Sequence, residues 1–206
     1  MRRFALAGML VLGACTQAEP VGNRPDANDA QVNVSENGTA DDGNGGDAEV
    51  GQTSAALVLS LAPDGLQLVE AISGKTYPIP FGTPEKDTVD RVAKARGDLV
   101  DKGGNDECGA GPIAYANFGG NVSLIFQDGK FAGWSVNDGG DSKITTLTGI
   151  GLGSTRKALE AAYAVTVEES SIGTEFSAGE LSGLLNGKGP DAKVTDIWAG
   201  VTCIAR

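Results

Sequence analysis

The stretch VSLIFQDGKFAGWSV, from Val122 to Val136, carries the clearest structural signal of this chain. Apolar residues dominate its two ends, and the turn sequence Gln127–Lys130 separates them. Two short apolar runs joined by such a turn predict a β-hairpin. Trp134 lies on the second predicted strand.

A similar pattern occurs earlier in the chain. The runs Leu57–Leu61 and Leu66–Val69 flank Pro63-Asp64-Gly65, in which Gly65 can supply the positive φ of a tight turn. The short run Tyr77–Phe81 follows and contains two prolines. Because proline cannot donate to a central ladder, we expect this run to be an edge strand or an irregular one.

Two segments carry helix-start signals. Gly82-Thr83-Pro84-Glu85 predicts a helix with Thr83 as N-cap and Pro84 as first helical residue, ending before Gly97. Gly153-Ser154-Thr155 opens a second helix. Both helices are expected to be short.

The remaining elements complete the expected fold. A polar loop is predicted between Gly97 and Glu107, and strands are predicted at Leu181–Leu185 and Lys193–Trp198. The fold class is therefore α+β, an antiparallel sheet built from hairpins with two short helices. Each helix start precedes a hairpin whose second strand carries a tryptophan, Trp134 or Trp198. A tandem helix–hairpin duplication explains this order, and so does a coincidence of common elements.

The first fifteen residues have the layout of a secretory signal peptide. Two arginines precede the apolar run Phe4–Leu12, which is far shorter than the roughly 20 residues that span a bilayer. The closing sequence Leu12-Gly13-Ala14-Cys15 resembles the lipobox of bacterial lipoproteins. That resemblance implies a signal peptide over 1–14 and a lipidated Cys15 as first mature residue. The alternative is an ordinary cleaved signal with a stray cysteine.

A lipid on Cys15 implies attachment to a membrane of the bacterial envelope. Thr16 stands where enterobacterial lipoproteins held at the inner membrane have aspartate, so the resemblance favours the periplasmic face of the outer membrane. Residues 16–53 hold eight acidic residues and one basic residue, with almost no large apolar side chain. Such a composition predicts a disordered acidic tether over 15–53, followed by one domain over 54–206.

Cys108 and Cys203 remain once Cys15 is assigned to lipid. An exported protein meets an oxidising compartment, so we expect these two residues to form a disulfide. Such a bond closes a long loop and is worth about 4–5 kcal/mol by chain-entropy reasoning. Two buried free thiols are the alternative.

The composition also bears on several classes of function. The chain has no histidine, which rules out Ser-His-Asp and Cys-His catalytic arrangements and imidazole metal ligands. A net charge of −11 without a basic cluster argues against nucleic-acid binding. The glycine-rich run Gly149–Ser154 lacks both nucleotide-binding fingerprints, so we expect no nucleotide and no cofactor.

Acidic side chains offer weak alternatives. Paired carboxylates for glycoside hydrolysis could come from Asp138, Asp141, Glu175 and Glu180, but no spacing singles them out. The segment Asp138–Asp141 also resembles half a calcium loop, yet the distal glutamate is missing. We expect a surface turn there and no metal site.

Further motifs carry a resemblance to known proteins. Ile150–Thr155, followed by Leu159 and Tyr163, resembles the helix opener of small secreted bacterial modules, including the tandem helix–sheet modules of the β-lactamase inhibitor protein type. Glu107–Pro112, Gly133-Trp134 and Trp198–Cys203 are similar to uncharacterised envelope lipoproteins of α-proteobacteria. The resemblance spans most of 57–206. It implies an α+β fold and an envelope location, without an established activity.

The expected function is a non-enzymatic interaction or scaffold module with an envelope protein as partner. Trp134 and Trp198 are candidate partner-binding residues, although matching positions on apolar strands favour the core for both. One alternative function is inhibition of a secreted hydrolase. Another is a histidine-independent hydrolase, for which Ser154 and Lys157 are the nearest Ser–Lys pair.

Overall fold

The computed structural model describes residues 56–204. The predicted signal peptide, Cys15 and the tether lie outside the described residues. Within that range the chain forms eleven strands and two helices, in the order β1 Leu57–Ala62, β2 Gly65–Glu70, β3 Thr76–Pro80, α1 Glu85–Arg96, β4 Leu99–Asn105, β5 Ile113–Phe118, β6 Val122–Gln127, β7 Lys130–Val136, α2 Arg156–Ala162, β8 Thr166–Ser170, β9 Gly173–Ala178, β10 Leu181–Leu185 and β11 Val194–Gly200.

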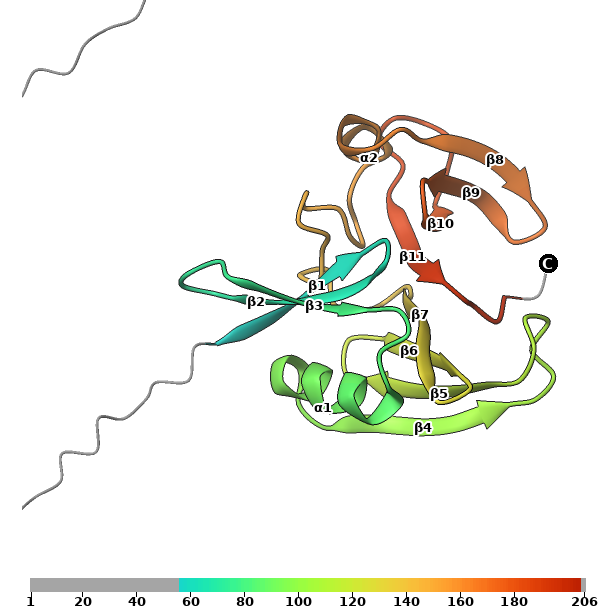
Figure 1. Ribbon diagram of the computed structural model, residues 1–206. Helices are drawn as coiled ribbons and strands as arrows, with labels where there is room; N and C mark the ends of the chain where they lie inside the picture. The colour runs from blue at the N-terminus through green and yellow to red at the C-terminus, as the bar shows by residue number, and fades with distance from the viewer. Residues whose placement is uncertain (1–55, 205–206) are drawn as a thin grey trace, which may run out of the picture. The chain divides into compact units, whose positions relative to one another are not determined.

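A helix followed by four antiparallel strands occurs twice along the chain (Figure 1). Helix α1 precedes β4–β7, and α2 precedes β8–β11. The last strands of the two sets, β7 and β11, pair with each other, so all eight strands form one sheet with the order β4-β5-β6-β7-β11-β10-β9-β8. A separate three-stranded sheet has the order β1-β2-β3.

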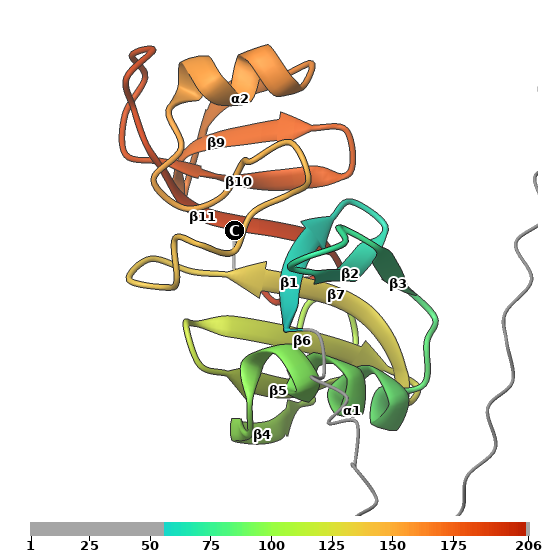
Figure 2. The same ribbon diagram turned by 90° about the vertical axis from the view of Figure 1, so that its left-hand side faces the viewer.

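The core lies on one face of the eight-stranded sheet. Figures 1 and 2 show the two helices and the small sheet on this side. Val92 of α1 and Leu159 of α2 are fully buried in the same cluster as Leu61 and Leu66 of the small sheet. Trp134 of β7 is also fully buried, and its indole N–H donates to the Ala62 carbonyl at 3.0 Å. The small sheet is therefore part of the core layer.

Several sequence predictions are confirmed. The hairpins β1–β2 and β6–β7 form, Gly65 has a φ of 151°, and β3 is an edge of its sheet. Helix α1 ends before Gly97 as expected. Helices and an antiparallel sheet do occur together, although the described residues are mostly strand, so the α+β description overstates the helices.

Two local predictions are wrong. The polar loop expected after Gly97 contains strand β4, whose sequence LVDKGGN has one apolar side chain packed against the core. An edge strand can form with so little burial, because its backbone bonds to a single neighbour, here β5. The N-cap of α1 is Pro84, and the Thr83 hydroxyl instead donates to the Pro80 carbonyl at 2.7 Å.

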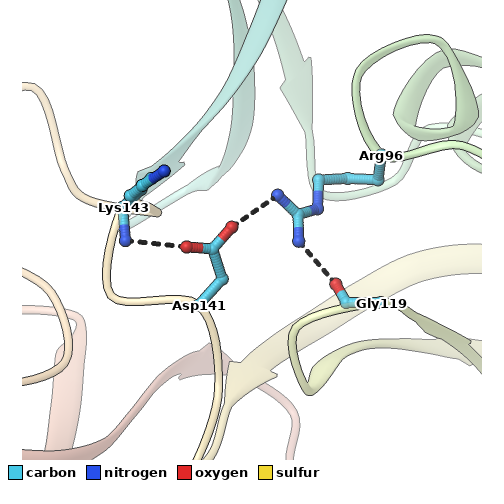
Figure 3. Close-up of polar contacts among 4 residues, drawn as sticks. All are labelled: Arg96, Gly119, Asp141 and Lys143. Carbon is cyan, nitrogen blue, oxygen red and sulfur yellow. Dashed lines mark hydrogen bonds and ion pairs between the residues drawn. The ribbon is translucent and has the colours of Figure 1, made fainter.

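An ion pair ties the end of α1 to the loop that follows β7 (Figure 3). The Arg96 guanidinium bonds Asp141 Oδ2 at 3.0 Å and donates to the Gly119 carbonyl at 2.6 Å. Asp141 Oδ1 accepts from the Lys143 backbone N–H at 3.0 Å. A Cβ on Gly120, which has a φ of 81°, would lie 2.5 Å from Arg96 Nη2. We call these contacts of Arg96 with Asp141 and Gly119 the Arg96 clamp. The clamp depends on glycine at position 120, because a larger side chain there would collide with the guanidinium.

The first prediction concerns Asp141. The Lys143 N–H, and then the Arg96 guanidinium, lower the pKa of its carboxyl. A carboxyl with a lowered pKa in the folded state stabilises the fold above its ordinary pKa of about 4, and this contribution is lost as the pH falls through the lowered value. We expect Asp141→Asn to reduce the free energy of unfolding by about 1–2 kcal/mol at pH 7.

Urea unfolding of both chains at neutral and acidic pH measures this effect. The difference between Asp141→Asn and the parent chain should begin to shrink below about pH 4, where Asp141 of the unfolded parent becomes protonated, and should be lost once the pH falls below the lowered pKa of the folded carboxyl. A difference that stays constant over the whole pH range would show that the clamp does not act through the charge of Asp141.

Candidate functional site

The other face of the eight-stranded sheet is the candidate site, and we call it the open face. Side chains alternate between the two faces along each strand, so neighbours of core residues point away from the core. A groove of about 540 Å³ lies on the open face. Strands of both four-stranded sets line it, together with Ile172 between β8 and β9 and the C-terminal segment Thr202–Ile204.

Small polar side chains form a row across the middle of the open face. Asn117, Ser123 and Ser135 are successive cross-strand neighbours on β5, β6 and β7. The register extends this row in both directions, giving Asp101, Asn117, Ser123, Ser135, Trp198, Ser182, Ser177 and Thr166. Apart from Trp198, every residue of the row is a serine, threonine, asparagine or aspartate, whose small side chain can form hydrogen bonds.

Apolar side chains flank this row on the first four strands. Tyr115 and Ile125 are cross-strand neighbours and both line the groove. Tyr115 faces Gly103 of β4, and a Cβ there would lie 2.6 Å from its hydroxyl oxygen. The missing side chain at Gly103 thus leaves the space that the tyrosine ring occupies.

Acidic side chains flank the row on the last four strands. The register aligns Asp196, Leu184, Glu175 and Glu168 across β11, β10, β9 and β8. Asp196 lines the groove, and its Oδ1 accepts a hydrogen bond from the Asp138 backbone N–H at 3.3 Å. Among the described residues that line the groove, Asp196 is the only charged side chain.

The segment that follows β11 crosses onto the open face next to β7. The Val201 N–H donates to the Ala132 carbonyl at 2.9 Å. A Cβ on Gly133 would lie 1.9 Å from the Val201 oxygen, so only glycine permits this crossing. Val201 packs against a small apolar cluster of Cys108, Ile113 and Ile125. The following residues, Thr202–Ile204, form one wall of the groove.

The two cysteines of the domain lie side by side at this wall. Cys108 is buried, Cys203 is exposed, and both are free thiols in the structure. Cys203 accepts a hydrogen bond from Asn105 Nδ2 at 3.4 Å. Its interaction with the Cys108 side chain raises the pKa of the Cys203 thiol, and burial adds to the effect. The predicted disulfide stays a prediction, but the pair is placed together.

The second prediction concerns this pair. With oxidised glutathione as electron acceptor, we expect both thiols to lose their protons and form one S–S bond, lowering the intact mass by two hydrogens. A raised thiol pKa leaves little thiolate at neutral pH, so oxidation should accelerate as the pH rises. Oxidation should raise the free energy of unfolding by up to about 4–5 kcal/mol.

Intact-mass spectrometry after alkylation, with and without reductant, checks this expectation. The Cys108→Ser variant is the control: its Cys203 should stay alkylatable after oxidant treatment, and the variant should show no stabilisation. A parent chain in which Cys108 and Cys203 are both alkylated after oxidant treatment would contradict the prediction.

The two tryptophans do not occupy matching positions. Trp134 pairs with Ala199, whereas Trp198 pairs with Ser135. These two pairs are adjacent in the ladder, so their side chains point to opposite faces of the sheet. Trp134 lies in the core, and Trp198, which is 5 % exposed, lies at the floor of the groove.

Other residues considered from the sequence serve local structure. Asp141 belongs to the Arg96 clamp, and the Ser154 hydroxyl accepts from the Gly151 N–H at 3.1 Å. Lys157 is exposed on α2, while Glu180 is exposed in the β9–β10 turn. Glu175 lies on β9, away in sequence from the Asp138 loop. Within residues 56–204, no cluster of three or more acidic or cysteine side chains could hold a metal ion.

Sequence reasoning did not predict the groove. Part of its lining comes from β4, from β5 and from the turn between β8 and β9. The sequence did not predict any of these strands. One signal was present in the sequence. Ser123 and Ser135 are polar residues within otherwise apolar strands, and side chains alternate between the two faces of a sheet, so these serines could have indicated a second, more polar face.

Comparison with known proteins gives no match. No protein-family model, curated protein or solved structure matches this chain. Neither helix of the described part of the chain has the length and apolar character that crossing a membrane requires.

Proposed function

We propose that this chain is a lipid-anchored protein of the bacterial envelope that acts as a non-enzymatic binding module. A lipid on Cys15 holds it at the periplasmic face of the outer membrane, and the tether extends the domain away from the membrane. The groove on the open face holds the partner. The observation that carries this proposal is the contrast between the two faces of one sheet.

That contrast is chemical as well as geometric. The helices and the small sheet cover one face and bury residues such as Trp134 and Leu124 completely. The opposite face carries no such layer among the described residues and has instead a groove of about 540 Å³, within the usual range of ligand sites. Apolar groups with a few polar ones at fixed positions are typical of binding sites.

The repeated order of elements supports a tandem duplication. The unit we propose is one helix with the four strands that follow it, which is larger than the helix–hairpin unit expected from the sequence. Its two copies meet at the β7–β11 pair, and the groove spans this junction.

Inhibition of a secreted hydrolase is the alternative function. It would use the same open face, where Tyr115 is half-buried and Trp198 is 5 % exposed. Buried aromatic side chains are poor anchors for insertion into an enzyme cleft, because anchors must reach a pocket on the partner. The binding module is therefore the function we favour.

The third prediction tests the proposed surface in cells. A photo-cross-linking phenylalanine analogue replaces Tyr115 in the full-length lipidated chain, and a matched chain carries it at Tyr77. Both tyrosines are half-buried on strands, but Tyr77 belongs to β3 of the small sheet. We expect irradiation to yield a discrete envelope adduct from position 115 and none from position 77.

The adduct is read by gel shift and mass spectrometry of the purified chain. Unchanged unfolding midpoints of both variants establish that they fold. Absence of any adduct at position 115, or equal adducts at both positions, would contradict binding at the open face.

A further inference from the structure

We propose that the groove on the open face binds an uncharged oligosaccharide. This inference rests on the proposed function, since it names the ligand class of the same surface. It is drawn from the hydrogen-bonding groups, the charge and the apolar surfaces that line the groove.

The groove contains hydrogen-bonding groups that have no partner in the described part of the chain. Within residues 56–204, no hydrogen bond engages the Tyr115 hydroxyl, the Ser135 hydroxyl, the Asn137 amide or the Trp198 indole N–H. The Asn117 carbonyl oxygen accepts from Ser123 at 2.7 Å, which leaves its amide N–H₂ available. Hydroxyl and amide groups both donate and accept, as sugar hydroxyls do.

The charge of the lining disfavours an anionic ligand. Asp196 is its only charged side chain, and no lysine or arginine is among the described residues of the lining. A phosphate or carboxylate in the groove would face Asp196, and the described residues of the lining offer no cation to offset the repulsion. A neutral ligand can instead donate hydroxyl hydrogens to this carboxylate, which is a strong type of hydrogen bond.

The same polar groups disfavour a purely apolar ligand. A lipid chain would displace water from the hydroxyl and amide groups and offer them nothing in return. Leaving buried polar groups without partners costs free energy, which opposes binding. The ligand must therefore carry many hydrogen-bonding groups of its own.

The apolar surface in the groove suits the C–H faces of a sugar ring. Trp198 and Tyr115 present aromatic surface, and Ile125 and Leu184 lie beside them on the floor and walls. Aromatic side chains combine apolar surface with one polar group, which suits a ring with C–H faces and hydroxyl edges. A peptide strand would pair more directly with the free backbone edges at β4 or β8, by strand addition.

The fourth prediction uses the two tryptophans as reporters. The full-length chain, labelled with 5-fluorotryptophan, gives one fluorine resonance from Trp134 and one from Trp198. Trp198→Phe assigns them. Tetrasaccharides of glucose, mannose and N-acetylglucosamine are the probes, with the uncharged alcohol octanol and a heparin-derived tetrasaccharide as apolar and anionic comparisons.

At least one neutral tetrasaccharide should shift the Trp198 resonance saturably at millimolar concentration and leave Trp134 in place. Octanol and the heparin fragment should shift neither resonance. Ser135→Ala removes one hydroxyl from the groove and should weaken binding roughly threefold to tenfold. The matched Ser142→Ala variant changes an exposed serine outside the groove and should bind like the parent.

Two results would overturn the inference. If no neutral tetrasaccharide moves the Trp198 resonance while position 115 still cross-links to an envelope protein, the groove binds a protein segment and the proposed function stands. If both experiments fail, the binding module falls together with its ligand class.

Discussion

The pairing of β7 with β11 is the constraint on which the rest of the structure depends. Four register pairs, from Val136–Ile197 to Gly133–Gly200, join two sets of four strands into one sheet. The same register assigns a face to each side chain, because an antiparallel ladder alternates faces at every step. It sends Trp134 into the core and Trp198 to the groove. A shift of this register by one residue would place both tryptophans on the same face of the sheet, so that either Trp198 enters the core or Trp134 leaves it.

The proposed binding function rests on that assignment of faces. One face stabilises the fold, because the helices and the small sheet cover its large apolar side chains and exclude water from them. The other face supplies a groove lined by both sets of strands, so neither set could form it alone. Glycines make close approaches possible: Gly133 admits the C-terminal segment, and Gly103 admits the Tyr115 ring. These positions therefore have a physical reason to resist substitution.

The sequence predicted elements whose stability is local. Apolar runs around a tight turn identified Val122–Val136, and Gly65 and Gly97 marked a turn and a helix end. It could not predict β4, whose mostly exposed side chains resemble those of a loop while its backbone bonds to β5. It also placed both tryptophans in equivalent positions, because their local contexts are alike and the register that separates them joins strands far apart in the chain. The groove was beyond sequence reasoning for the same reason, whereas the neighbouring cysteines were identified by counting alone.

The most direct test of the central claim compares the groove with another surface inside the envelope. Leu184→Cys places a thiol in the groove and Val58→Cys places one on β1, each in a chain with Cys108 and Cys203 changed to serine. Maleimide labelling rates are measured in isolated envelopes and again after purification. The account predicts that residue 184 is protected in envelopes and becomes reactive on purification, while residue 58 reacts alike in both. Equal rates for residue 184 in the two preparations would contradict a groove that is occupied in its native setting.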